Sequence, residues 1–159
     1  MPLNPAVLQN ALLKLSTTDK PPDPFTAARL IASAYREYAA AGVSLGFPLL
    51  TPGPGSVTME LALGAAFAAL PGAPPVVAAG YASMLTLFWA GAVFAGIPFP
   101  GIAAPPPGAV AVIPVVSTLL IVPNPAAVYA LSVAAALHAA TLTTLVTFPQ
   151  PLGPPLVGP

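Results

Sequence analysis

One run of 22 residues, VVAAGYASMLTLFWAGAVFAGI at positions 76–97, contains no charged residue and no proline. If this run is helical, its bulky side chains recur at spacings of three, four and seven residues and form one stripe, with small side chains opposite. The stripe consists of Val77, Tyr81, Met84, Leu85, Phe88 and Trp89, and the small side of Ala79, Ser83, Thr86 and Ala90. The pattern predicts a central helix packed between layers of protein, with Phe88 and Trp89 in the core and a small side that lets another backbone come close.

Two amphipathic helices are predicted before this run. The Asn-Pro pair at 4–5 and the Asp-Pro pair at 23–24 each place an acceptor side chain before a proline whose φ already suits a helix. The first helix should end near Ser16, because a polar, proline-rich segment follows. The second should run to Ala41 and be ended by Gly42 in a left-handed conformation. Its inward residues are expected at Leu30, Ile31, Ala34, Tyr35 and Tyr38, and its outward ones at Arg29, Ser33, Arg36 and Glu37.

Two further helices are predicted from local signals. Ser56 can cap a helix over residues 57–70, and the helix dipole favours Glu60 in its first turn. A third proline start, the Asn-Pro pair at 124–125, precedes an alanine-rich helix over residues 126–140.

Short strands are predicted in two places. Residues 109–113 alternate weakly, and Pro114 limits such a strand to an edge or a bend. Residues 115–122 fit either a strand or a short helix. Residues 141–148 read TLTTLVTF, as in a half-exposed strand. In that strand Leu142, Val146 and Phe148 would face one way and Thr141, Thr143 and Thr147 the other.

Together these elements predict a mainly α fold. It comprises one small helical domain over residues 1–148 with a short β element near the C-terminus, and an α+β fold is possible. A proline-rich arm over residues 149–159 cannot continue a sheet and should lie along a surface, its own or a neighbour's. The expected contact residues are the edge residues Leu145, Val146, Thr147 and Phe148 and the arm residues Pro149, Pro151 and Leu152.

The distribution of charge indicates an assembled protein. Charged residues make up 5% of the chain, against about 25% in typical soluble domains, and residues 61–159 contain none. A free monomer with zero net charge and so few charges would have little to oppose self-association. Four basic and four acidic residues form no basic surface, which argues against a nucleic-acid partner.

No pattern of catalytic or metal-ligating residues is present. The chain has one histidine, His138, and no cysteine, and its carboxylates lie far from His138 in sequence. We therefore expect no metal, no cofactor and no enzymatic activity, with His138 as a packed or interfacial side chain. Gly53 to Ser56 resemble half of a phosphate-binding loop but lack its lysine, so a turn is predicted there.

A small integral membrane protein is the alternative, with helices at 76–97 and 126–148. A 22-residue helix is long enough to cross a hydrocarbon core of roughly 30 Å. However, neither run is flanked by Lys or Arg, and the second contains a histidine and several threonines, which are costly in lipid. An obligate interface of about 2,000 Å² or more accounts for the same apolar surface, and we favour it.

Several segments also resemble a known family. LNPAVLQNALLKL, ARLIASAYREYAAAG, LTLFWAGAVFAG and ALHAATLTTLVTFPQP are similar to alanine-rich structural proteins encoded among the tail genes of tailed phages and phage-like contractile particles. The resemblance implies a virion or tail-particle component without enzymatic activity, whose partners are copies of itself and other particle proteins. It supplies no functional residues.

Overall fold

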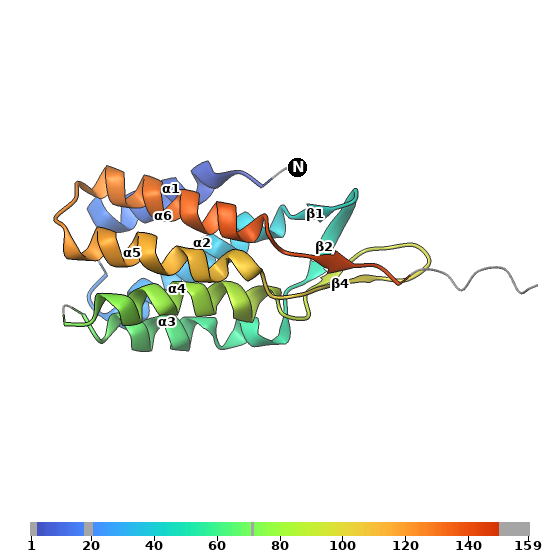
Figure 1. Cartoon of the computed structure of the whole chain (residues 1–159), viewed down its shortest axis with the longest axis horizontal. Coiled ribbons are helices and arrows are strands. Elements are labelled where there is room, and N and C mark those ends of the chain that lie inside the picture. Colours follow the sequence, from blue (N-terminus) through green and yellow to red (C-terminus); the bar gives the residue numbers. More distant parts are fainter. Residues whose placement is uncertain (1–2, 18–20, 71, 150–159) are drawn as a thin grey trace, which may run out of the picture.

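The computed structural model describes residues 3–17, 21–70 and 72–149. In this part of the chain, six α-helices lie side by side and alternate in direction (Figure 1). They are α1 (Pro5–Thr17), α2 (Pro24–Ala40), α3 (Met59–Phe67), α4 (Pro74–Trp89), α5 (Val112–Ile121) and α6 (Ala126–Thr141). Each helix packs against the next one along the chain, and α1 also packs against α6, so the helices close into a ring. The prediction of a mainly α domain is confirmed.

Five short antiparallel strands extend the molecule beyond one end of this bundle (Figure 1). They are β1 (Val43–Ser44), β2 (Phe47–Thr51), β3 (Val93–Phe94), β4 (Gly101–Ala103) and β5 (Val146–Thr147), and they pair in chain order. The α2–α3 connection supplies β1 and β2, the α4–α5 connection supplies β3 and β4, and β5 follows α6. Because the helices alternate in direction, all three segments emerge at the same end. The β element expected near the C-terminus is thus one edge of a sheet drawn from three parts of the chain.

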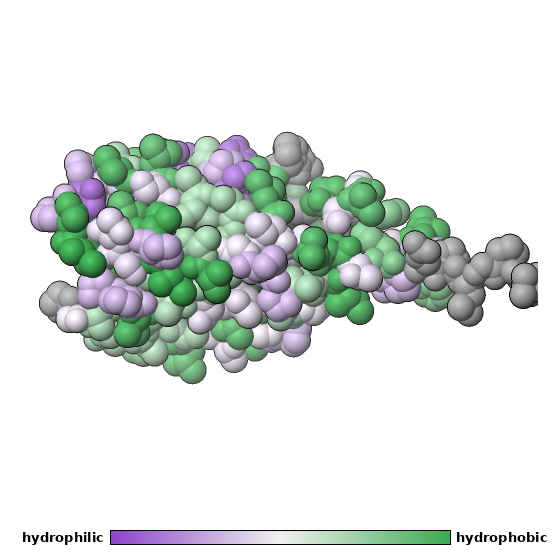
Figure 2. All heavy atoms as spheres, in the orientation of Figure 1, coloured by the Kyte–Doolittle hydropathy of each residue, from purple (hydrophilic) through white to green (hydrophobic). Residues whose placement is uncertain are grey.

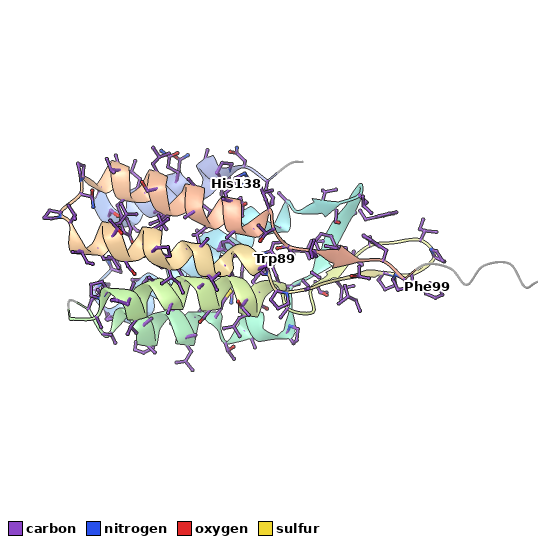
Figure 3. The ribbon with its side chains drawn as sticks, in the orientation of Figure 1. Trp89, Phe99 and His138 are labelled. Carbon is purple, nitrogen blue, oxygen red and sulfur yellow. The ribbon has the colours of Figure 1, made fainter. Side chains whose placement is uncertain are left out.

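A series of buried hydrogen bonds joins three helices where the bundle meets the sheet. The indole Nε1–H of Trp89 donates to the Tyr35 hydroxyl at 2.7 Å, and the Tyr35 and Thr141 hydroxyl oxygens are 2.7 Å apart. The Thr141 hydroxyl donates its single hydrogen to the carbonyl oxygen of Leu137 at 2.7 Å, so Tyr35 must be the donor to Thr141. This series, here called the Trp89 relay, connects α4, α2 and the last turn of α6. Figure 3 shows Trp89 at the junction between the helices and the sheet.

The bulky stripe predicted for residues 76–97 lies in the core on α4. All six of its side chains are at most 2% exposed. Phe88 meets Trp89 edge-on with ring centroids 5.0 Å apart, and Tyr35 meets Phe88 in the same way at 5.4 Å. Such ring pairs contribute about 0.5–1.5 kcal/mol each beyond the burial of their surface. The aromatic cluster therefore surrounds the Trp89 relay with apolar packing.

The expected length of this helix was wrong, because α4 ends at Trp89 and not at residue 97. Gly91 adopts a positive φ of 77°, and its amide donates to the carbonyl oxygen of Ala103. The chain then enters β3, which pairs with β4 and buries Phe94. The chain therefore leaves the helix after Trp89 and pairs with β4. Among the described residues, no helix is both long and apolar enough to cross a membrane.

Helix α2 begins where the Asp-Pro pair predicts. Asp23 is the N-cap, and its Oδ1 and Oδ2 accept from the amide and the hydroxyl of Thr26 at 2.9 and 2.6 Å. Four of the five residues expected to face inward are buried, but Leu30 is 39% exposed. The buried face of α2 is therefore rotated from the predicted one, away from Leu30 and toward Ala28, Ala32 and Ala39.

The end of α2 also differs from expectation. Gly42 does not have a positive φ, and Ala41 caps the helix. A side chain at Gly42 would place its Cβ 2.9 Å from the carbonyl oxygen of Ala39 and 3.4 Å from the Trp89 ring. Glycine is favoured here by the close approach to the carbonyl oxygen of Ala39, not by a left-handed turn.

The start of α3 lies two residues later than expected. Ser56 is buried in a 3₁₀ turn, Pro54–Val57, and does not cap a helix, because Thr58 occupies the N-cap position. Glu60 lies in the first turn as predicted and pairs with Arg36 of α2. Arg36 also donates to the carbonyl oxygen of Ser56 at 2.9 Å. This half-exposed pair links α2 to the start of α3, with a contribution of about 0–1 kcal/mol.

Two strand predictions were wrong. Residues 109–113 lie in a 3₁₀ turn and the start of α5, where Pro114 falls in the first helical turn and needs no amide partner. Residues 141–148 form a strand only at β5, because Thr141 is held in α6 by its bonds in the Trp89 relay. Leu142 consequently lies in a turn and is exposed.

Replacing Tyr35 with Phe is expected to lower the free energy of unfolding by about 1–3 kcal/mol, because the buried indole N–H of Trp89 loses its acceptor. Thr118→Val is the control, because it removes an exposed hydroxyl that donates to the carbonyl oxygen of Pro114 in the same helix. No buried partner loses a hydrogen bond in this variant, so the loss of free energy of unfolding should stay below about 1 kcal/mol. Urea unfolding followed by the fluorescence of the single tryptophan measures both variants. Equal losses of the free energy of unfolding in the two variants would show that the Trp89 relay stabilises the fold no more than an exposed hydrogen bond does.

The N-cap of α2 predicts a pH dependence. Hydrogen bonds from the Thr26 hydroxyl and amide hold the pKa of Asp23 below its usual value. A carboxylate with a lowered folded-state pKa stabilises the fold above its unfolded-state pKa and loses that effect as the pH falls through the folded-state pKa. Asp23→Asn keeps an oxygen acceptor but does not titrate. Between about pH 6 and about pH 2.5, we expect the urea midpoint to fall further in the wild type than in Asp23→Asn, and parallel curves would refute this.

Candidate functional site

The sheet end of the molecule carries large exposed hydrophobic side chains and no charge. Residues 43–51, 93–103 and 145–149 contain no charged residue. Six large apolar side chains in these segments are more than half exposed, and we call the surface that they form the apolar pole. It consists of Leu45, Leu50, Ile97, Phe99, Ile102 and Leu145. In the face shown in Figure 2, the most hydrophilic residues lie over the helical end, whereas green residues predominate over the sheet.

Strand register explains which residues are left uncovered. Val93, Ile102 and Thr147 are cross-strand partners and therefore share one face of the sheet. Their neighbours Phe94 and Ala103 point to the opposite face and are buried, each 3% exposed. Ile102 in the middle of the outer face is 54% exposed. The sheet thus covers the end of the core with one face and presents an apolar face outward.

Leu45 breaks a local rule of backbone conformation. It forms with Gly46 the two-residue turn between β1 and β2, and both have a positive φ, 51° and 85°. Such a turn favours Asn, Asp or Gly, and a branched apolar residue in this conformation costs about 1–3 kcal/mol. Leu45 is also 83% exposed, so no contact inside the described chain offsets this strain. An unfavourable residue at an exposed turn is typical of a position selected for contact with a partner.

The β3–β4 hairpin carries the apolar pole furthest from the helices. Ile97 and Phe99 lie in its turn and are 88% and 52% exposed, and the peptide bond between Ile97 and Pro98 is cis. Figure 3 shows Phe99 at the outer end of this hairpin. The hairpin therefore presents two large apolar side chains at the end of the molecule.

The predicted contact residues divide into two groups. Val146 pairs with Ala103, and the Phe148 ring contacts the Phe47 ring in a tilted arrangement with centroids 5.5 Å apart, so both are half-buried within the chain. The Phe148 ring also lies against Gly101, where a Cβ atom would come within 2.5–2.7 Å of it. The other described candidates, Leu145, Thr147 and Pro149, are exposed, and β5 is a terminal strand of the sheet. Pro151 and Leu152 lie outside the described residues.

Sequence reasoning missed most of the apolar pole. The sequence predicts no helix or strand in the segments that contain Leu45, Phe99 and Ile102. Ile97 lies at the end of the predicted central helix. A Leu-Gly pair is a weak hairpin signal compared with Asn-Gly, and prolines flank Ile97 and Phe99. Only the pairing of distant strands reveals that these residues share one end of the molecule.

A second uncovered surface runs along α4. The small side chains Ala79, Ser83 and Thr86 are exposed, so no described helix covers the side that is expected to accept another backbone. They line a groove of about 470 Å³, together with Val110 and Ile113 beside α5. The groove has no charged lining residue. It can accept an uncharged segment of a neighbour at close range.

His138 packs within the chain. Its Nδ1 lies 2.7 Å from the hydroxyl of Tyr38, and the two rings meet edge-on. Burial raises the pKa of Tyr38 to about 12, so its hydroxyl remains protonated near neutral pH. Within the described ranges, no group of three or more His, Asp or Glu side chains lies close enough together to hold a metal ion.

Comparison of the chain with protein-family models, with curated proteins and with solved structures finds no match.

Proposed function

We propose that this chain is a non-enzymatic structural subunit of a phage virion or phage-tail-like particle, held in a permanent assembly with copies of itself and other particle proteins. The observation that carries the proposal is the charge-free apolar pole with Leu45 strained and exposed on it. The low charge of the whole chain and the resemblance of its segments to phage tail proteins support the same proposal.

The energetics of the apolar pole favour an apolar partner. Fully burying one large aliphatic or aromatic side chain contributes about 1.5–3 kcal/mol, so covering the exposed parts of these six contributes on the order of 6–12 kcal/mol. Association itself costs about 4–15 kcal/mol. If a polar surface covers one apolar pole, the free energy gained by burial is therefore largely offset by the cost of association, and little net affinity remains. Pairing it with a second apolar surface buries apolar area on both partners and favours a stable complex.

The two uncovered surfaces support contact with more than one neighbour. The apolar pole lies at one end of the molecule and the α4 groove on the side of the bundle. A chain with two different contact surfaces can bind different neighbours in a repeating array, as a particle subunit must. Neither surface contains a charge, so salt should have little effect on the contacts.

Leu45→Asn tests the apolar pole. The full-length wild type should form oligomers in sedimentation velocity, with a distribution that changes little between about 0.1 and about 1 M salt. Leu45→Asn should weaken association and raise the free energy of unfolding of the dilute chain by about 1 kcal/mol, since Asn tolerates the positive φ. Leu131→Gln on α6, where Leu131 is 53% exposed, is the control and should associate like the wild type. The proposal would be contradicted if the wild type stays monomeric at every concentration, or if Leu45→Asn and Leu131→Gln weaken association equally.

Deleting residues 149–159 tests the predicted arm. Incorporation into particles should fall several-fold, whereas the helical circular dichroism should be unchanged and the free energy of unfolding should remain within about 0.5 kcal/mol of the wild type. The reason is that the six described helices close into a ring through contacts with one another. Mass spectrometry of purified particles measures incorporation. Normal incorporation of the truncated chain would remove the arm from the interface. Absence of the full-length chain from particles, with its recovery from detergent-extracted membranes, would reject the proposed function.

A further inference from the structure

A cavity lies at the end of the bundle opposite the sheet. It has a volume of about 390 Å³ and is bordered by the last turns of α1, α3 and α5 and the first turns of α2, α4 and α6. Its walls are mainly apolar and include Leu12, Ile31, Phe67 and Leu120. An engineered apolar cavity of about 150 Å³ binds benzene. The present cavity therefore has room for roughly fifteen non-hydrogen atoms.

Two tyrosine hydroxyls lie in the cavity wall, beside Asp23 and the hydroxyl of Ser16, which donates to the carbonyl oxygen of Leu12. The hydroxyl oxygens of Tyr81 and Tyr129 are 3.3 Å apart, and neither has another hydrogen-bond partner in the described chain. Tyr81 is fully buried, so its hydrogen must be used in this bond, because a buried donor without an acceptor is costly. Tyr129 then acts as the acceptor, and its own hydroxyl hydrogen has no acceptor among the described residues. The half-buried Tyr129 hydroxyl can therefore donate to a molecule in the cavity.

The ionisation states around the cavity favour an uncharged occupant. Burial raises the pKa of both Tyr81 and Tyr129, so both phenols remain neutral at physiological pH. Asp23 is the one ionisable acid or base among the other lining residues, and both of its carboxylate oxygens already accept from Thr26. A carboxylate ligand would find no cationic partner among the described lining residues and would lie near the charge of Asp23.

We propose that this cavity binds a small, uncharged and mainly apolar molecule that carries one hydrogen-bond acceptor, such as a ketone or ester carbonyl, and that Tyr129 donates to this acceptor. The site lies at the other end of the molecule from the apolar pole, and it does not depend on the proposed assembly. A neutral hydrogen bond of this kind should tighten binding about threefold to tenfold.

Benzophenone and diphenylmethane test the proposal, because they have similar size and shape and differ mainly by a carbonyl in place of a methylene. Titration of the full chain, followed by NMR, should give saturable binding of both, with benzophenone about threefold to tenfold tighter. Tyr129→Phe should bind both with nearly equal affinity. Tyr38→Phe, which removes a hydroxyl outside the cavity, should keep the wild-type preference.

A second variant tests the location independently of the hydroxyl. Ala27 lines the cavity, and Ala27→Leu should fill part of it and weaken binding of both probes by at least about tenfold. Urea unfolding confirms that each variant is folded. The proposal is overturned if the wild type binds neither probe saturably, if Tyr129→Phe keeps the preference for benzophenone, or if a folded Ala27→Leu binds both probes like the wild type.

Discussion

The fold depends on the Trp89 relay, in which an indole N–H, a phenol and a threonine hydroxyl each donate to the next group and the last donates to a helix carbonyl. Its three side chains come from α4, α2 and α6, and all are buried. Trp89 is the last residue of α4 and Thr141 the last residue of α6. The relay therefore joins three helices at the level where two of them end and the sheet begins. Breaking any link would leave a polar group without a partner in an apolar core, which makes the arrangement specific.

The positions at which α4 and α6 end determine which residues form the sheet. Because α4 stops at Trp89, residues 93–103 are free to form a hairpin, and because α6 stops at Thr141, β5 can pair with it. One face of the sheet then closes the core with Phe94 and Ala103. The other face and the turns carry apolar side chains that no described part of this chain covers. The same constraint that completes the core thus produces the surface on which the proposed assembly depends.

The two ends of the molecule differ in a way that suits different partners. The apolar pole is convex, carries strain at Leu45 and offers no buried polar group, which favours a large apolar protein surface. The cavity at the opposite end is concave and contains one uncommitted donor, which favours a small molecule with one acceptor. The bundle separates them, so each can be altered without direct contact with the other.

The sequence by itself determined the local features of this protein. Proline after Asn or Asp located the starts of α1, α2 and α6, and the spacing of bulky residues identified the buried stripe of α4, because these signals act within one or two helical turns. The absence of charged residues from the second half of the chain indicated a surface that is buried against a partner. The tertiary structure alone decided where α4 and α6 end and which apolar residues stay outside. Those outcomes depend on hydrogen bonds and close contacts between residues such as Tyr35, Trp89 and Thr141, which lie 50 or more positions apart in the chain, and no local pattern encodes such pairings.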